Sequence, residues 1–478
     1  AQVRANFGSS AVSPVWLVEL RGYQPGALAV AYDLAHGAAP RGALSLAFAP
    51  RESFADFYAS SHGWGTVDGD PTVGGRYYPA EVIEPPAVTH ALQLDPTRPA
   101  AAASWGDLLL ANPPANGRTA PGPWDALIES YAFDGYLLRV LLAPRIWDAG
   151  RQIWRARPYA ASAVVFDGLV AAIWRTPEGV RVRLRDRSQQ LEEPAQPLTF
   201  AGGGGLGGGA ALEGQRRPLL IGTGDNLPVQ LVDDTGPIYE VSSQPGAVLE
   251  VYEDGLGAAG GGYADAGEVA DIEAAAPAAG TYVWSSGPAG LHLRLGSAPK
   301  GRITVRARGD VAGVGAVASA AVQAKAYLTG VFGLDAGELD GQSFAGLDAL
   351  RPWAAVVFLP AGDDTPAVEL VGRLLVSVGA QIAVGVTGLL EARSILPPWP
   401  DPGPEARYDT AQVIDVRSLP VPDGLAPIAG RWTVGYAYNP AVMTDGVNAA
   451  VNAARRDWLA QPWRTVARAD AGVLDAHR

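Results

Sequence analysis

The stretch from residue 180 to residue 239 limits most strongly what this chain can fold into. In its first part, VRVRLR, Val180, Val182 and Leu184 point to one side and the arginines between them to the other. A period of two is typical of a strand with one buried and one solvated face. Turn-forming residues follow at 186–188, and the glycine run at 202–209 predicts a flexible tether. We therefore expect a β-rich chain with a domain boundary at this tether.

The length and composition of the chain support several domains with many turns. A chain of 478 residues predicts about three domains, at roughly one domain per 150 residues. The 59 Gly and 39 Pro make up about a fifth of the chain, which is below the roughly 25–30% typical of disorder. This content instead favours short strands joined by turns. The sequence thus indicates a multidomain protein that is mainly β.

The first 200 residues are predicted to form a β domain with long loops. Strands are expected at 15–20, 44–48, 136–142, 164–174 and 180–184. The region from 59 to 123 is rich in Pro and Gly, and we interpret it as loops that contact other subunits.

The rest of the chain changes character near residue 311. We predict a second β module at 201–310, an α+β module at 311–430 and a final strand and helix at 431–478. Within these parts we expect helices at 316–332, 365–378 and 445–459, the last capped by Asp445, and strands near 354–359, 382–386, 412–416 and 432–438.

Charge and cysteine content exclude several functions. A net charge of −13 argues against nucleic acid as a partner, because phosphate binding requires clustered cations. The absence of Cys excludes disulfides, thiolate nucleophiles and cysteine-bound metals, and it suits assembly in a reducing cytoplasm. The N-terminal sequence shows no pattern typical of a secretory signal.

One uncharged segment, residues 374–390, imitates a membrane span. Glycines interrupt it, and its two halves have helical and alternating periods. We predict a buried helix followed by a hairpin that turns near Thr387 and Gly388, and no membrane span.

No motif predicts a metal or nucleotide site. The five histidines are isolated in the sequence, at positions 36, 62, 90, 292 and 477. Gly203, Gly205 and Gly208 match a GxGxxG pattern, as almost any polyglycine would. A second glycine pattern, at 313–318 with Asp335 about twenty residues on, leaves a dinucleotide-dependent oxidoreductase as a weaker alternative.

No motif predicts a hydrolase either. Pairs of neighbouring carboxylates occur at 363 and 364, at 192 and 193 and at 68 and 70, but closeness in sequence does not supply the separation between two carboxyl groups that a glycosidase needs. Residues 68–71 are interpreted as a turn and not as a calcium-binding loop. The 13 Trp are expected to be core or interface anchors more often than sugar platforms. We therefore predict no enzyme activity and no catalytic, cofactor-binding or metal residues; the alternative is a secreted carbohydrate-binding or glycoside-hydrolysing multidomain β protein.

The order of several segments resembles a family of tail-tip (baseplate) proteins of long-tailed bacteriophages. These segments are RLRDRSQQL, RPLLIGTGDNLPVQLVDDTGPIYEV, VLEVYEDG, LHLRLGSAPKGRITVRARGD, SFAGLDAL, DDTPAVELVGRLLVSVGA and RWTVGYAYN. The resemblance is collinear over most of the chain. Where the family usually continues with Asn-Trp, this chain has Asn439 followed by Pro440.

The resemblance implies a fold and a role. It implies a mainly β, multidomain chain with α+β modules and hub-like β-barrel or sandwich domains. The implied role is a structural hub of the virion tail tip that joins the tail tube to fibres or receptor-binding parts during assembly and host attachment. The implied partners are copies of the chain in a ring, three being favoured and six possible, and other tail proteins such as the distal tail protein and fibres. Assembly would take place in the host cytoplasm.

Overall fold

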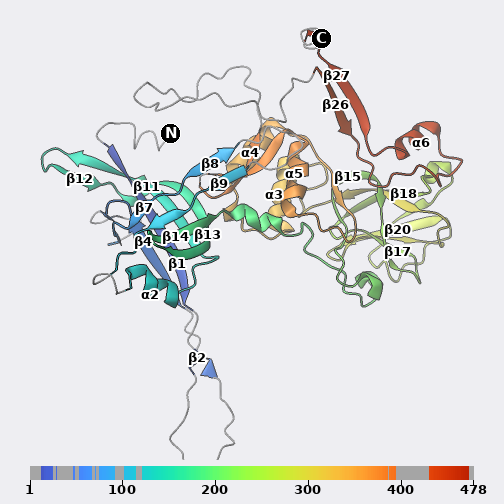
Figure 1. The fold of residues 1–478 in the computed structure, drawn as a ribbon. Helices are drawn as coiled ribbons and strands as arrows, with labels where there is room; N and C mark the ends of the chain where they lie inside the picture. Colours follow the sequence, from blue (N-terminus) through green and yellow to red (C-terminus); the bar gives the residue numbers. More distant parts are fainter. Residues whose placement is uncertain are drawn as a thin grey trace, which may run out of the picture. The chain divides into compact units, whose positions relative to one another are not determined.

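The computed structural model describes residues 12–24, 28–29, 47–48, 53–66, 70, 75–91, 102–114, 121–385, 387–394 and 430–472. Strands make up 42% and helices 19% of the structure, which confirms the expected mainly β fold class. The chain forms two compact units (Figure 1). Unit 1 comprises residues 1–91, 102–189 and 384–389, and unit 2 comprises the remainder. The four-part division expected from the sequence stays a prediction.

Unit 1 is built on one open, eight-stranded sheet. The strands are in the order β4-β1-β11-β13-β14-β10-β7, and β12 pairs with β11. Their bounds are β1 Val12–Gln24, β4 Ser53–Ser60, β7 Val82–Glu84, β10 Leu108–Leu110, β11 Leu137–Asp148, β12 Ile153–Ala156, β13 Ala163–Thr176 and β14 Gly179–Arg185.

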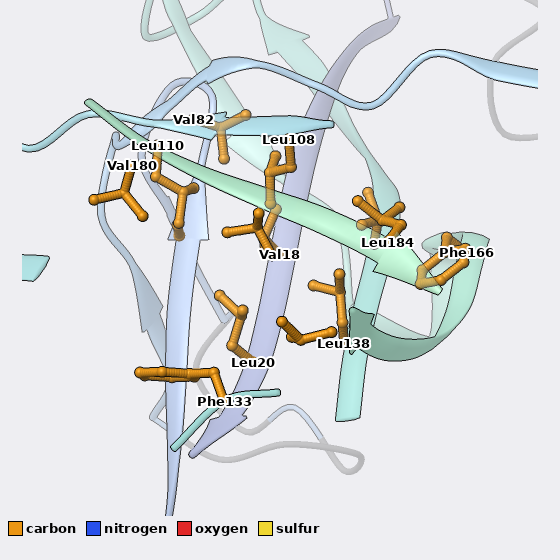
Figure 2. Packing of buried hydrophobic residues seen from close by; sticks show 14 of the residues in the cluster. Val18, Leu20, Val82, Leu108, Leu110, Phe133, Leu138, Phe166, Val180 and Leu184 are labelled. Carbon is orange, nitrogen blue, oxygen red and sulfur yellow. The ribbon is translucent and has the colours of Figure 1, made fainter. Parts of the chain in front are cut away.

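The alternation in the sequence creates the core of unit 1 (Figure 2). Val180, Val182 and Leu184 are all buried, whereas Arg183 between them is exposed. They pack with apolar side chains of the neighbouring strands and with Trp124 of helix α2 (Pro123–Ser130). The strand expected at 180–184 is confirmed, as are those at 15–20, 136–142 and 164–174.

The region from 59 to 123 contains more strand than expected. Two-stranded pairs form between β5 (Trp64–Gly65) and β6 (Tyr77–Tyr78) and between β8 (Val88–Ala91) and β9 (Ala102–Trp105). These strands are two to four residues long, too short to show a period in the sequence. Of the strand expected at 44–48, the described residues show β3 (Ala47–Phe48), paired with β2 (Leu28–Ala29).

Unit 2 has two sheets that share one apolar core. A four-stranded sheet has the order β18-β22-β15-β23, and a five-stranded sheet the order β16-β17-β21-β20-β19. Buried side chains from both sheets, including Leu220, Val251, Tyr282 and Leu293, form a single cluster. The strand bounds are β15 Leu219–Pro228, β16 Gln230–Asp233, β17 Ile238–Ser242, β18 Gly246–Glu253, β19 Ala264–Glu268, β20 Thr281–Gly287, β21 Gly290–Leu295, β22 Ile303–Gly309 and β23 Val357–Leu359.

The glycine run at 202–209 is not the flexible tether that we expected. It lies inside unit 2, and its backbone is hydrogen-bonded, with the N–H of Gly204 donating to the carbonyl of Gly208 at 2.8 Å. Four of its glycines have positive φ, between 55° and 88°, a conformation that costs glycine little. Leu206 packs against a cluster that includes Phe200. The glycines therefore permit a compact turn, and the boundary between the units falls earlier, after residue 189.

The predicted helices of unit 2 are present. The helices expected at 316–332 and 365–378 are α3 (Ala320–Gly330) and α5 (Ala367–Val376). Between them lies a helix that was not expected from the sequence, α4 (Gly341–Leu350). After α5, β24 (Ala380–Val384) and β25 (Leu390–Ser394) form the expected hairpin, which turns through a bond from Gly388 N–H to the Gly385 carbonyl of 3.0 Å. No helix in the described part of the chain is long and apolar enough to cross a membrane. The strand expected at 412–416 lies outside the described residues.

The C-terminal helix is shorter than expected and has a different cap. The β26–β27 ribbon, β26 (Arg431–Tyr436) paired with β27 (Arg464–Ala469), encloses helix α6 (Ala453–Leu459). The side chain of Asn452 caps α6 by accepting from the Arg455 N–H at 2.9 Å. Asp445 is not the cap, because the residues after it form turns, including Gly446 at φ 67°.

Two buried asparagines connect the start of unit 2 to its C-terminal segment. Asn226, at the end of β15, has a positive φ of 54° and donates from its side chain to the Asn439 Oδ1 at 2.7 Å and to the Ala441 carbonyl at 2.8 Å. Its Oδ1 accepts from the Thr304 hydroxyl at 2.7 Å. Both amides are almost fully buried. Asn439 in turn donates to the Leu459 carbonyl at 3.0 Å and to the Gln461 carbonyl at 3.1 Å.

We expect Asn439→Ala to loosen the segment between β26 and β27. The change removes the acceptor of one buried Asn226 N–H and the side-chain donor to the Gln461 carbonyl, whereas the Leu459 carbonyl still accepts from the Met443 N–H; the lost bonds cost about 1–3 kcal/mol. Limited proteolysis and hydrogen exchange of residues 440–461 measure the effect. Asn448→Ala, which changes an exposed asparagine of the same segment, is the matched control. Equal protection of the two variants would contradict the role given to Asn439.

Candidate functional site

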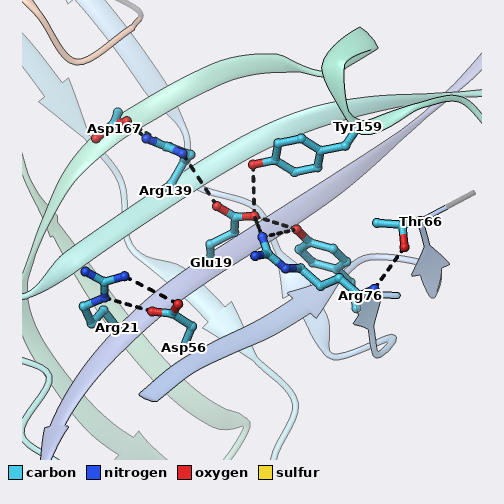
Figure 3. A network of polar contacts seen from close by, with 9 residues as sticks. Glu19, Arg21, Asp56, Thr66, Arg76, Arg139, Tyr159 and Asp167 are labelled. Atoms are coloured by element: carbon cyan, nitrogen blue, oxygen red, sulfur yellow. Dashed lines mark hydrogen bonds and ion pairs between the residues drawn. The ribbon is translucent and has the colours of Figure 1, made fainter. Parts of the chain in front are cut away.

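The first polar cluster centres on Glu19 in β1 of unit 1 (Figure 3). Its Oε1 accepts from the Tyr78 hydroxyl at 2.5 Å, the Tyr159 hydroxyl at 3.0 Å and the Arg76 guanidinium at 3.0 Å. Its other oxygen lies 3.9 Å from Arg139. Burial raises the pKa of Tyr159 to about 12 and also raises the pKa of Tyr78, so both phenols remain donors at neutral pH.

The surroundings of Glu19 indicate a structural role. The donors come from β6 and the residue before it, from β11 and from the short η1 helix (Tyr159–Ala161), so one carboxylate holds three elements against β1. A general acid or base needs a path to substrate. Here the nearly buried carboxylate accepts three hydrogen bonds at Oε1, and Oε2 forms an ion pair with Arg139. The cluster therefore ties these elements to β1.

The second cluster is a buried ion pair in unit 2 with a histidine beside it. Arg217 donates from Nε to the Glu240 Oε1 at 2.8 Å, and Glu240 on β17 is fully buried. Burial raises the pKa of Glu240 to about 7, against the opposing effect of Arg217. His292 on β21 stands opposite Glu240 in the sheet and is also buried.

His292 is held neutral by its position. Burial lowers its pKa to about 4, and the charge of Arg217 acts in the same direction. Within the described residues, Glu240 Oε2 and His292 Nε2 have no hydrogen-bond partner. Both side chains are inside the sheet and closed to solvent, so the cluster offers a buried titrating pair and not an open reaction centre.

The other residues weighed from the sequence have local structural roles. Asp335 caps a turn by accepting from the Gly337 N–H at 2.6 Å, and the N–H of Gly315 donates to Asp310 at 2.7 Å. The residues of the 313–335 glycine pattern therefore form hydrogen bonds within their own loops. Asp363 accepts from the Thr365 N–H at 2.7 Å, and its neighbour Asp364 pairs with Arg216.

The remaining candidates do not converge either. Glu192 and Glu193 are exposed. Asp70 is buried and accepts from the Tyr159 N–H, while Asp68 lies outside the described residues. Of the histidines, His62 is exposed beside Ser61, His292 is buried, and 36, 477 and the side chain of His90 fall outside what the structure describes. The described residues contain no group of three or more His, Cys, Asp or Glu that could hold a metal ion.

The tryptophans divide between core and surface. Trp64 and Trp124 are buried core residues. Trp147 and Trp154 are 42% and 40% exposed, and they face each other across the β11–β12 hairpin at 5.4 Å between ring centroids. The order of residues in this hairpin, Ile-Trp, a turn and Ile-Trp again, is visible in the sequence, but the strand predicted there stops at residue 142.

The β11–β12 hairpin carries apolar side chains on both faces. We name residues 145–157 the Trp hairpin. Its first strand pairs with β1 as far as Ile146, and β12 pairs with β11 at residues 145–148 (Figure 1). Ile146 and Ile153 are exposed together with the two tryptophans, and they point to the face opposite the Trp pair.

The β26–β27 ribbon has the same character in unit 2. Val434 and Val466 are directly paired and are 57% and 47% exposed, and Tyr436 is 50% exposed. Every residue of β27 is exposed. Each unit therefore presents a strand pair whose apolar side chains are between 36% and 57% exposed.

The comparisons with known proteins give one remote neighbour. No family model matches the chain, and no curated protein matches it. Among solved structures, a chain described as "Virion of native gene transfer agent (GTA) particle" is similar at 13% identity, covering 64% of this chain and 82% of that chain, with a TM-score of 0.21. A TM-score this low does not establish a common fold.

The buried His292 predicts a specific acid sensitivity. Its pKa is about 4 in the folded state and about 6.5 in an unfolded chain, so the stability it contributes is present above pH 6.5 and is lost as the pH falls through 4. The shift corresponds to about 3 kcal/mol. We expect His292→Leu to reduce the loss of unfolding free energy between pH 7 and pH 4 by about this amount, measured by urea unfolding.

Comparing the pH dependence of unfolding free energy in wild type and His292→Leu separates the contribution of His292 from that of Glu240. Glu240 has the opposite dependence, because its raised pKa gives stability below pH 4.5 that is lost as the pH rises through 7. His62→Leu, which removes an exposed histidine, is the matched control. The same acid dependence in wild type and His292→Leu would refute this assignment.

Proposed function

We propose that this chain is a non-enzymatic structural protein of a virion, a hub-like component of a phage tail tip. Its function is to form interfaces that join the tail tube to fibres or receptor-binding parts. The single observation that carries the proposal is that each unit presents exposed apolar side chains on a strand pair, at the end of the large sheet in unit 1 and on the separate β26–β27 ribbon in unit 2.

The physical argument concerns the stability of such ribbons. A separate two-stranded ribbon such as β26–β27 is marginally stable in water by itself. A pair such as Trp147 and Trp154 gains little by staying exposed, whereas Trp and Arg at a protein interface supply much of its binding free energy. Ribbons of this kind suit a protein that is stable as part of an assembly.

The internal polar clusters support the same class of function. Glu19 and Glu240 are carboxylates in unusual environments, but each is buried behind strands and paired with arginine. Active sites place perturbed groups in a cleft that substrate can enter. Buried, paired carboxylates instead stiffen a sheet, which is what a load-carrying assembly part requires.

The order of sequence segments provides further support. The segment GTGDN contributes Asn226 and the segment GYAYN contributes Asn439, and the two side chains are hydrogen-bonded to each other. Two parts of the collinear resemblance to tail-tip proteins thus serve one packing arrangement. On this proposal the chain forms a ring with copies of itself, three favoured and six possible, it contacts distal tail and fibre proteins, and it is assembled in the host cytoplasm and carried in the virion tail tip.

The direct test is the composition of particles and the association state of the purified chain. We expect peptides of this chain in purified virions and concentration-dependent association in sedimentation velocity. A chain that stays monomeric at high concentration and is missing from virions would overturn the proposal. Glycan binding that depends on Trp147 or on one carboxylate would favour the alternative, a carbohydrate-binding or glycoside-hydrolysing protein.

The ribbon predicts a variant that folds but does not assemble. We expect Val434→Asp with Val466→Asp to lower the unfolding free energy by no more than about 1 kcal/mol, because both side chains are exposed and the main cost is repulsion between the two carboxylates across the ribbon. The same change places two carboxylates on one face of the ribbon and is expected to reduce incorporation into particles at least about tenfold, measured by quantitative mass spectrometry.

Val317→Asp is the matched control, since Val317 is 80% exposed and lies outside the ribbon. Normal incorporation of the ribbon variant would remove this ribbon from the list of assembly contacts.

A further inference from the structure

The charge of the chain is divided unequally between the two units. Unit 1 contains 16 of the 36 basic and 16 of the 49 acidic residues, so it is neutral. Unit 2 contains the other 20 basic and 33 acidic residues, and it therefore carries the whole net charge of −13. A basic surface on unit 1 would be attracted to unit 2 of another copy.

The Trp hairpin is such a basic surface. Within residues 145–157 there are four arginines and one acidic residue, Asp148. Arg155 pairs with Asp148 at 3.4 Å. Arg151 and Arg157 are exposed, and within the described chain their side chains form no ion pair. Exposed arginine next to exposed tryptophan is the composition of an interface centre.

The complementary surface lies in the five-stranded sheet of unit 2. No Lys or Arg occurs between residues 218 and 293, whereas 11 Asp and Glu occur there. Part of this segment is β19, the outermost strand of its sheet. We name residues 264–273 the acidic edge. It contains four exposed carboxylates with no ion pair among the described residues, namely Asp265, Glu268, Asp271 and Glu273.

The acidic edge also has unused backbone groups. Strand β19 pairs with β20 along one side, and in the described part of the chain no other strand pairs with its opposite side. An outer strand with free N–H and C=O groups is a template for another chain, and proteins usually cover it. Charge and backbone thus point to the same edge of the sheet.

We propose that the Trp hairpin of one copy docks on the acidic edge of unit 2 in a second copy. This inference rests on the proposed function, since it names the contact by which copies assemble. The arginines face the carboxylates of β19, and the exposed Trp147 and Trp154 are covered by the neighbouring copy. The two surfaces are different, so the contact is head-to-tail, and repetition of such a contact generates rings when the rotation closes.

A charge exchange tests the contact. Arg151→Glu with Arg157→Glu reverses the hairpin, and Glu268→Lys with Glu273→Lys reverses the edge; none of these side chains makes a hydrogen bond or ion pair within the described chain. Each double variant is expected to weaken self-association about tenfold or more, measured by sedimentation equilibrium at low salt. Combining all four changes in one chain is expected to restore association to within about threefold of wild type.

Cross-linking identifies the partner surface. The chain has no Cys, so separately prepared Gln152→Cys and Ala266→Cys chains can be mixed and oxidised, both free in solution and after incorporation into particles. The expected product is a link between residue 152 of one copy and residue 266 of another, identified by mass spectrometry. A chain that carries both cysteines serves as the comparison. A disulfide that forms within this double variant, with no disulfide between chains in the mixture of single variants, would overturn the proposal.

The outcomes separate this inference from the proposed function. If the wild type assembles or enters virions and both charge-reversed variants associate as strongly as the wild type, the hairpin contact is overturned. The proposed structural role is then unaffected. A wild type that is monomeric and absent from virions overturns the structural role itself. Loss of binding to phosphatidylglycerol vesicles in the Arg151→Glu and Arg157→Glu variant, with unchanged self-association, would assign the hairpin to a lipid surface and reject the proposed contact.

Discussion

The arrangement of unit 2 depends on one buried amide pair, Asn226 with Asn439. Asn226 sits where the register of β15 against β22 shifts, between Gly224 and Leu227, and its positive φ turns the side chain out of the ladder. That side chain bonds Asn439 and the Ala441 carbonyl, which are more than 200 residues away in sequence. An unpaired amide at this depth would cost about 1–3 kcal/mol, so the C-terminal segment has one favourable position, and this position fixes the base of the β26–β27 ribbon.

The sequence was sufficient where one physical signal dominated. Alternation located β14, because Val180 and Val182 could be buried in one way, and the mixed period of 365–390 located α5 and the following hairpin. It was insufficient where the outcome depended on distant partners. The glycines at 202–209 are compatible with both a flexible tether and a compact turn. Packing of Leu206 against the cluster around Phe200 favours the compact turn. Likewise nothing near Asn439 in the sequence indicates that its partner is Asn226.

The sequence indicated that tryptophans would matter for the candidate site, but it did not indicate which tryptophans are exposed. The expectation that tryptophans would serve as core anchors is confirmed for Trp124, which is buried, whereas Trp147 is exposed and its role at an interface stays a prediction. What distinguishes them is their place in unit 1: Trp124 lies on α2 and packs into the core, whereas Trp147 lies on the β11–β12 hairpin with its ring exposed. A list of tryptophans contains no information on which elements carry them, so the Trp hairpin required the structure.

The distribution of charge explains why exposed apolar ribbons can be tolerated before assembly. Copies whose unit 2 carries the entire charge of −13 repel one another through that unit, which opposes indiscriminate contact between apolar surfaces. A neutral unit with a basic hairpin reverses the sign of that interaction at one place. In the contact that we propose, attraction at long range selects the orientation in which the hairpin approaches the acidic unit, and apolar contact follows at short range. Repulsion and attraction in the same chain would then direct association toward a head-to-tail arrangement, in which every copy both gives and receives one contact.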